Sequence, residues 1–234
     1  MDTNTVEAYQ LYTEQTVKGR VTCRRTGKVT VVKNNVTGPL VELATAFTSA
    51  TPDVDSVAEH DRWKSGIGPF EEENQIEVIL DALEGHPLRR TIETEVPYLN
   101  GKQRCDLVLD YDEKVLPVEA KLLRFRYDNG NIDPNSFARI FTPFPERSSS
   151  SLLTDTKKLY ESEFESSGGV LGLYYEKIDE EYEQMTAEAV AEKFCMDVGH
   201  WYDFQVETSN IAYFDGLQHP AHQQGAVVTW EIVD

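Results

Sequence analysis

Three ionisable residues near the middle of the 234-residue chain have the types and spacing that metal-assisted chemistry needs. Asp106 lies in a run rich in Val and Leu, and Glu119 and Lys121 lie in the next such run, VLPVEAKLL. Charged residues in an apolar run need a partner or a function, because burial of an unpaired charge is costly. The alternative is a solvated strand face on which these charges have no joint role.

The two runs predict a β-hairpin that brings these residues together. Arg104–Asp110 and Val115–Leu123 flank the polar connection YDEK, whose length is common in hairpins. If the residues on either side of this connection pair, Asp106 lies directly opposite Glu119. Side chains alternate along a strand, so Lys121 shares their face. The residues predicted to form core on the other face are Leu107, Leu109, Val118, Ala120 and Leu122.

Two opposed carboxylates need a positive charge between them. The Cβ atoms of directly opposed residues lie about 5 Å apart, and like charges at this separation destabilise a strand pair. Mg²⁺ suits the position because it binds through one or two carboxylates, keeps several waters and accepts phosphate oxygens. We therefore expect Mg²⁺ as the cofactor, with Mn²⁺ able to substitute for it. Lys121 would contact a scissile phosphate or an attacking water.

At these residues the chain resembles the PD-(D/E)xK nuclease superfamily, whose restriction-endonuclease-like fold carries its acidic pair and lysine on such a hairpin. The matching residues are Asp106 and the tripeptide Glu119-Ala120-Lys121. The chain departs from the pattern because no proline precedes the aspartate, and Pro117 removes a ladder donor from the second strand. The resemblance implies that Asp106, Glu119 and the Ala120 carbonyl hold Mg²⁺. It also implies that Lys121 orients the attacking water.

A helix predicted over Pro69–Glu84 supplies a further acidic candidate. Its first turn contains three glutamates, which complement the helix dipole, and Gly85 follows its end. The residues of its apolar stripe are Ile76, Ile79, Leu80 and Leu83. The resemblance implies that one glutamate of this helix reaches the metal site. We expect this residue to be Glu73, with Glu72 and Glu77 as the alternatives.

A third strand is predicted to precede the hairpin. Arg89–Leu99 has strand character, and Asn100-Gly101 is a strong signal for a two-residue turn. Pairing around this turn places Glu95 opposite Asp106, on the side away from the second hairpin strand. Glu95 is then either a second metal ligand or an outward-facing strand residue.

Basic residues that follow the hairpin are candidates for DNA contacts. Arg124 and Arg126 come shortly after the E-A-K tripeptide. Lys157 and Lys158 belong to a helix predicted over about 150–166, near the end that faces the site. We expect all four to contact DNA phosphates. The alternative for the lysines is that they only solvate the helix.

The order helix, three strands, helix, strand predicts an α/β fold with a mixed sheet. Its last strand, at 170–175, reads VLGLYY and is a strong signal for a buried strand. This order resembles the restriction-endonuclease-like core, over about residues 68–176. We expect a nuclease domain at 66–234 with a β-rich C-terminal addition, which begins with a helix capped by Thr186. Residues 1–65 are expected to form an N-terminal extension that ends in a linker, TPDVDS.

The charge of the chain is the main objection to a nucleic-acid substrate. There are 22 Lys and Arg against 41 Asp and Glu, and the resulting net charge of -19 repels phosphate. One explanation is a halophilic source, since concentrated salt shortens the Debye length to about 3 Å. The other is that the protein is an acidic mimic of DNA.

The hydropathy of the chain predicts a cytoplasmic protein with no membrane partner. No apolar run approaches the roughly 20 residues that a membrane span needs. The first residues, MDTNTVEAYQ, lack the features of a signal peptide.

Together these patterns predict a Mg²⁺-dependent endonuclease that hydrolyses DNA phosphodiester bonds, of the restriction type or a related defence type. A homodimer is expected, because cutting both strands usually requires two active sites. The alternatives are a DNA repair or structure-selective nuclease, a non-catalytic module that binds nucleic acid or protein, and the DNA mimic.

Overall fold

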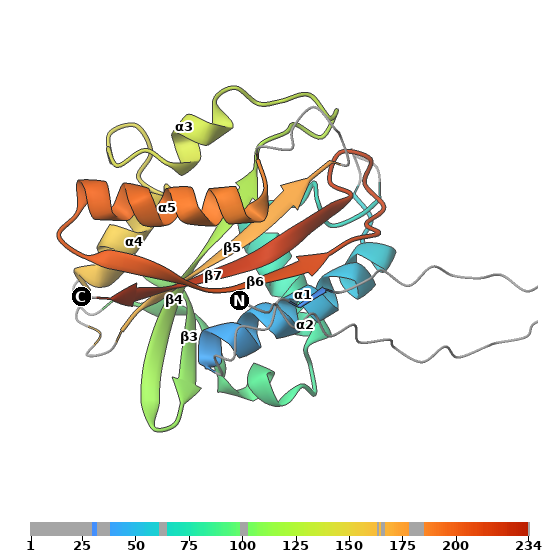
Figure 1. The fold of residues 1–234 in the computed structure, drawn as a ribbon. Helices are drawn as coiled ribbons and strands as arrows, with labels where there is room; N and C mark the ends of the chain where they lie inside the picture. Colours follow the sequence, from blue (N-terminus) through green and yellow to red (C-terminus); the bar gives the residue numbers. More distant parts are fainter. Residues whose placement is uncertain are drawn as a thin grey trace, which may run out of the picture.

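A computed structural model of the chain describes residues 30–31, 38–60, 65–98, 103–162, 164, 167–177 and 185–233. Within these residues, helices cover both faces of one seven-stranded mixed sheet, which confirms the predicted mixture of α and β elements (Figure 1). Most of the predicted N-terminal extension lies outside the described residues.

The helices and strands follow one another along the chain largely in the predicted order. The strands are β1 (Thr30–Val31), β2 (Ile92–Pro97), β3 (Arg104–Tyr111), β4 (Lys114–Arg124), β5 (Gly169–Glu176), β6 (Gln205–Phe214) and β7 (Gln224–Val233). The helices are α1 (Pro39–Val57), α2 (Glu72–Ala82), α3 (Ser136–Ile140), α4 (Leu152–Tyr160) and α5 (Ala187–Trp201), with a 3₁₀ helix, η1, at Pro87–Thr91. Ser151 and the predicted cap Thr186 precede α4 and α5, where each hydroxyl accepts a backbone N–H of the first turn.

The sheet has the strand order β1-β6-β7-β5-β4-β3-β2. Strands β2, β3 and β4 form consecutive antiparallel pairs, whereas β4 and β5 are parallel. The connection between these parallel strands contains α3 and α4, as a parallel pair requires a long crossover. Strands β6 and β7 extend the same sheet beyond β5, so the predicted C-terminal addition is continuous with the core sheet.

The β3–β4 hairpin has the predicted register, from Tyr111↔Lys114 to Leu107↔Val118. Its turn is shorter than the predicted four-residue connection. Only Asp112 and Glu113 lie outside the strands, with φ of 49° and 65°. Two positive φ values in succession match the turn type that two-residue hairpins favour, even though neither residue is glycine. The β2–β3 register also agrees with the prediction, although the Asn100-Gly101 turn lies outside the described residues.

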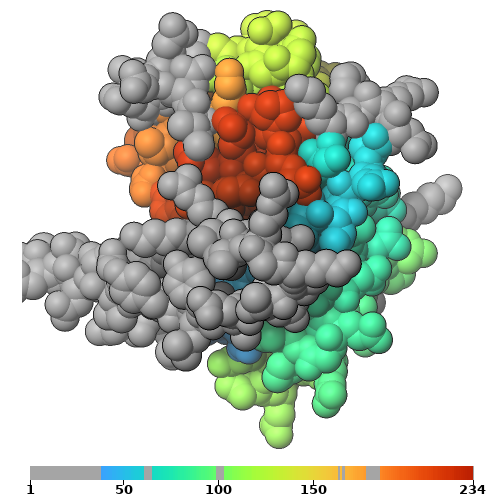
Figure 2. Space-filling model, turned by 90° about the vertical axis from the view of Figure 1, so that its right-hand side faces the viewer, coloured from blue at the N-terminus to red at the C-terminus, as the bar shows by residue number. Residues whose placement is uncertain are grey.

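Helix α1 corrects the prediction of a linker at TPDVDS. A single helix continues through Pro52 to Val57, because contacts made after the proline hold it. The Asp55 carboxylate, 1% exposed, accepts the backbone N–H groups of Ile67 at 2.9 Å and Gln218 at 2.7 Å. The end of α1 therefore lies against the loop between β6 and β7, and Figure 2 shows this part of the chain beside the C-terminal residues.

The sheet separates two hydrophobic clusters. One contains residues of α1 and α2, and the other contains residues of α4 and α5. The predicted core face of the hairpin belongs to the first cluster, with Leu122 partly buried and the other four residues buried. Asp106, Glu119 and Lys121 consequently lie on the α4 side, where a helix can meet them.

Candidate active site

Strand β4 continues beyond its last pair with β3, and side chains satisfy its backbone there. The N–H of Ala120 donates to Oδ2 of Asp106 at 2.7 Å. Two residues further on, the N–H of Leu122 donates to the carboxylate of Glu72, which comes from the first turn of α2. Two carboxylates thus replace the neighbouring strand at this point of the sheet.

The predicted acidic pair meets at this edge. Glu119 is 3% exposed, and burial, together with the charge of Asp106, raises the pKa of its carboxyl from 4.5 to about 8. Its Oε1 accepts the Tyr98 hydroxyl and lies 3.0 Å from Nζ of Lys158. Among the described residues, Oε2 of Glu119 and Oδ1 of Asp106 accept no hydrogen bond.

Lys121 is held between two carboxylates. Its Nζ lies 3.0 Å from Oε1 of Glu72 and 2.9 Å from Oδ2 of Asp155. Burial alone would lower the pKa of Lys121, but the two carboxylates raise it above its ordinary value. The side chain is therefore an ammonium ion at neutral pH.

Asp155 links the two lysines of the site, because its Oδ1 also lies 3.4 Å from Nζ of Lys158. Glu72, Lys121, Asp155, Lys158 and Glu119 thus form one ion-pair series that joins α2, β4 and α4. With Asp106 at its end, this cluster has four carboxyl groups and two ammonium groups. Such an excess of acid is suited to a divalent cation.

The helix glutamate at the site is Glu72 and not Glu73. Glu72 contacts Lys121 and β4, whereas Glu73 is exposed. Helix geometry gives the reason, since residues three and four positions apart share a face. Glu72 shares its face with Gln75 and Ile76, which are both buried, whereas the exposed Glu77 lies four positions after Glu73.

Glu95 is exposed, which agrees with the outward-facing alternative. Its backbone has φ of 52°, and its carbonyl accepts a guanidinium hydrogen of Arg104 at 2.7 Å. Burial and the charge of Asp106 raise the pKa of its carboxyl. It lies near the acidic pair in space without a hydrogen bond to it.

The lysines of α4 differ from each other in their surroundings. Lys158 is in the ion-pair series and lies over the Tyr98 ring, and its expected contact with a DNA phosphate stays a prediction. Lys157 remains about half exposed, 3.5 Å from Glu161 and over the ring of Tyr202.

The two arginines expected to contact DNA donate hydrogen bonds to backbone carbonyls of nearby loops, and their contact with DNA stays a prediction. Arg124 donates to the carbonyl of Gly68 at 2.5 Å and lies 3.7 Å from Oδ1 of Asp128. Arg126 donates to the carbonyl of Gly130 at 2.8 Å. Both side chains thus connect the end of β4 to neighbouring loop segments.

Two residues of the site, Asp155 and Tyr98, are absent from the sequence predictions. Asp155 lies three positions before Lys158 in T-D-T-K-K, and this helical spacing is a signal that could have indicated a pair. Tyr98 lies just after β2, and only the register of the sheet brings its hydroxyl to Glu119. Burial raises the pKa of Tyr98, so its hydroxyl remains a donor.

The oxygen ligands of the acidic pair fit Mg²⁺. No group of three or more His, Cys, Asp or Glu in the described part of the chain is arranged to enclose a metal ion. Mg²⁺ does not require such a cage, because one or two carboxylates suffice when waters and substrate phosphates complete the shell. Asp106 and Glu119 each keep one carboxylate oxygen without a hydrogen bond from the described residues. The Ala120 carbonyl lies on the same strand edge as its N–H.

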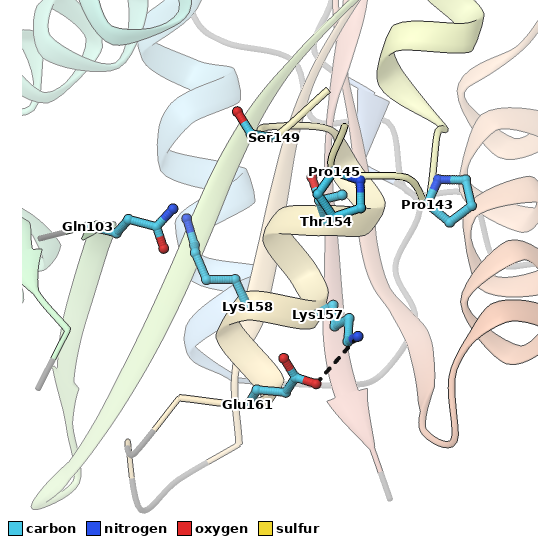
Figure 3. Close-up of a pocket in the computed structure, with 8 residues that line it drawn as sticks. All are labelled: Gln103, Pro143, Pro145, Ser149, Thr154, Lys157, Lys158 and Glu161. Carbon is cyan, nitrogen blue, oxygen red and sulfur yellow. Dashed lines mark ion pairs between the residues drawn. The ribbon is translucent and has the colours of Figure 1, made fainter. Parts of the chain in front are cut away.

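A pocket of about 450 Å³ adjoins this cluster (Figure 3). The residues that line it are Gln103, Pro143, Pro145, Ser149, Thr154, Lys157, Lys158 and Glu161. Lys158 belongs both to this pocket, which we call the α4 pocket, and to the ion-pair series. The side chain of Lys158 therefore connects the acidic pair to a pocket that can hold a ligand.

Comparisons of the chain with protein-family models, with curated proteins and with solved structures found no match. In the part of the chain that the structure describes, no helix has the length and apolar character of a membrane span. The geometry of the acidic cluster is therefore the basis for a functional proposal.

Proposed function

We propose that the protein is a Mg²⁺-dependent endonuclease that hydrolyses phosphodiester bonds in DNA. The observation that carries this proposal is the meeting of Asp106 and Glu119 at the open edge of β4, with the ammonium of Lys121 on the same face. The restriction or defence type expected from the sequence remains part of the proposal.

Asp106, Glu119 and the Ala120 carbonyl would hold the ion. When bound, Mg²⁺ would polarise the phosphate and lower the pKa of a coordinated water. The carboxyl of Glu119, with a pKa of about 8, must lose its proton before it can act as a ligand. Metal loading would therefore release a proton near neutral pH.

Lys121 would act as a cationic hydrogen-bond donor and not as a base. Glu72 and Asp155 keep it protonated, and they hold its ammonium in one place. An ammonium so placed can orient an attacking water or stabilise charge that develops on a phosphate oxygen. Glu72 and Asp155 would then be positioning residues.

The acidic surface is compatible with a DNA substrate if the protein works in concentrated salt. A net charge of -19 repels phosphate over about 10 Å at 0.1 M ionic strength but over only about 3 Å at 1 M. We therefore keep a halophilic source as part of the proposal. A DNA mimic would have no need of a buried lysine between two carboxylates.

Plasmid cleavage tests the proposed function. Supercoiled plasmid is incubated with the full chain in Mg²⁺ across a range of KCl concentrations, with EDTA as the metal-free control. We expect cleavage that EDTA and Asp106→Asn abolish. The matched control is Asp110→Asn, an exposed aspartate on the same strand, which should retain activity. Intact plasmid under all conditions, or full activity of Asp106→Asn, would contradict the proposal.

The products distinguish types of nuclease. Discrete bands would support a sequence-specific enzyme of the restriction type, whereas preferential cutting of nicked or branched DNA would support a repair or structure-selective enzyme. Sedimentation of the protein with and without DNA tests the proposed homodimer.

A further inference from the structure

The α4 pocket has walls of three chemical kinds. Pro143 and Pro145 supply flat apolar surfaces, and Gln103, Ser149 and Thr154 supply an amide and two hydroxyls. The charged residues are Lys157, Lys158 and Glu161, of which Lys157 and Glu161 pair at 3.5 Å (Figure 3). A ligand of this pocket would be planar, with hydrogen-bond donors and acceptors on its edge and no large net charge.

Lys158 fixes the position of such a ligand relative to the acidic pair. Its side chain lines the pocket, and its Nζ lies 3.0 Å from Oε1 of Glu119. A group in the pocket would therefore be a neighbour of any phosphate held at Asp106 and Glu119. A nucleobase joined to that phosphate meets both requirements, because it is planar and carries donors and acceptors.

An exposed aromatic residue stands between two residues of the pocket wall in the sequence. Phe144 lies between the two prolines of the wall, is 40% exposed, and meets the 46% exposed Trp201 with ring centroids 5.6 Å apart. Lys157 of the wall also lies over the ring of Tyr202, which is partly buried. Exposed aromatic rings beside a cationic group are the stacking surfaces that proteins use for unpaired bases.

The negative charge of the protein also favours contact with the bases of a nucleic acid over contact with its phosphate backbone. The chain has a net charge of -19, and Arg124 and Arg126 donate to the carbonyls of Gly68 and Gly130. Phosphate contacts would therefore be few, and salt would weaken them further. Stacking on aromatic rings and proline depends little on charge. In paired DNA the bases are stacked on each other and cannot enter a pocket.

We infer that the α4 pocket binds the base of an unpaired nucleotide next to the scissile phosphate, so that the substrate is single-stranded DNA or duplex DNA in which the base at the cleavage site leaves the stack. The inference rests on the proposed function for the location of the phosphate. Binding of the base does not require cleavage, and the two can be measured separately.

The test uses the full chain in EDTA, where cleavage cannot occur. Fluorescence anisotropy compares a labelled single-stranded oligonucleotide with the same sequence in a duplex. We expect the single strand to bind more tightly. Ser149→Trp, which fills the exposed mouth of the pocket, and Phe144→Ala should each weaken binding by about tenfold, near the lower limit of a stacking contribution. The controls are Ser49→Trp, at an exposed position of α1, and Tyr111→Ala, at the hairpin end of β3.

A base-specific probe completes the test. An oligonucleotide with one 2-aminopurine should change its fluorescence on binding to the wild-type protein and not to Ser149→Trp. Equal affinity for the single strand and the duplex, or unchanged binding by Ser149→Trp, would overturn the inference even if the plasmid is cleaved. Base-dependent binding without any plasmid cleavage would support the pocket and overturn the proposed nuclease.

Discussion

Asp155 on α4 lies 2.9 Å from the ammonium of Lys121 on β4, and the same carboxylate lies 3.4 Å from the ammonium of Lys158. One acid thus neutralises part of the charge of both lysines at the site. Asp155 is only 5% exposed. If its carboxylate is removed by substitution, water cannot take the place of the carboxylate beside the two lysines. Asp155 belongs to α4, so the acidic pair and its lysines keep this arrangement only when α4 packs against β4.

Asp155→Asn should therefore destabilise the protein and reduce cleavage together. Removal of the only partner of a buried charge costs about 3 kcal/mol or more. Lys121 keeps Glu72 and Lys158 keeps Glu119, so we expect Asp155→Asn to cost less than this. Urea denaturation and plasmid cleavage give the two readouts. The control is Glu161→Gln on the same helix, whose exposed pair with Lys157 should contribute less than about 1 kcal/mol. Equal effects of the two substitutions would contradict the proposed positioning role.

Lys121→Met should reduce turnover by about a hundredfold or more while Mg²⁺ affinity changes little. The reason is that the proposed contacts of Lys121 are to water and phosphate and not to the ion. Calorimetric titration with Mg²⁺ and single-turnover cleavage separate the two quantities. Lys157→Met, the half-exposed lysine of the same region, serves as the control for turnover. A loss of Mg²⁺ affinity equal to the loss of turnover would assign Lys121 a different role.

The stability of the metal-free protein should fall as pH rises from about 5 to about 8. Burial raises the pKa of Glu119 from 4.5 to about 8, so in this range the folded state keeps a proton that the unfolded chain has lost. The free energy of unfolding then decreases with pH, by at most about 1.4 kcal/mol per pH unit for this group, and levels off above the folded pKa. Urea denaturation at several pH values measures this slope.

Glu119→Gln isolates this contribution, since burial also raises the pKa of Glu72, which acts in the same direction. The slope of the wild type minus that of the variant is the contribution of Glu119. Mg²⁺ should reduce the wild-type slope, because it stabilises the ionised carboxylate. Identical slopes for the two proteins would contradict the assigned pKa.

His222 should give the opposite pH dependence on the acidic side. It is 1% exposed, and burial lowers its pKa to about 4, although Asp128 lies 3.0 Å from its Nε2. Between about pH 6.5 and pH 4 the unfolded chain binds a proton that the folded state excludes, so stability is lost as pH falls. His222→Gln should flatten this part of the stability curve. A variant that loses stability on acidification as steeply as the wild type would show that another group titrates there.

Salt should stabilise the protein if its many acidic residues are an adaptation to concentrated salt. Repulsion among 41 acidic side chains is screened as the Debye length falls, from roughly 10 Å at 0.1 M to about 3 Å at 1 M. Melting temperature should therefore rise with KCl, and cleavage should persist in molar salt. A protein that melts higher in dilute buffer and never nicks DNA would instead support the DNA mimic.

The central hairpin and its acidic pair could be predicted because local patterns determine them. Alternation of apolar residues specifies which side chains share a face, so Leu107 and Val118 face the cluster of α1 and α2 while Asp106 and Glu119 lie on the opposite face. The register of β2 and β3 is the one that the Asn100-Gly101 turn signal predicts.

The remaining residues of the site could not be predicted because distant segments supply them. Asp155 lies 34 positions after Lys121, on α4. No local sequence pattern indicates where this helix packs against the sheet. The choice between Glu72 and Glu73 depends on the rotation of α2 about its axis, which is settled by packing against β4. Helix α1 continues through Pro52 for a similar reason, since Asp55 is anchored to Gln218 at the far end of the chain.

The carboxylates of Asp106 and Glu72 also control what can pair with β4. Their hydrogen bonds occupy the N–H groups of Ala120 and Leu122, which would otherwise form an open row of donors at the side of a strand. Such a row is a template for addition of a foreign strand and for aggregation. An approaching strand would have to displace two acids and bring its own carbonyl oxygens against their charge. The side chains that make this part of β4 suitable for a cation therefore also keep a foreign strand from pairing with it.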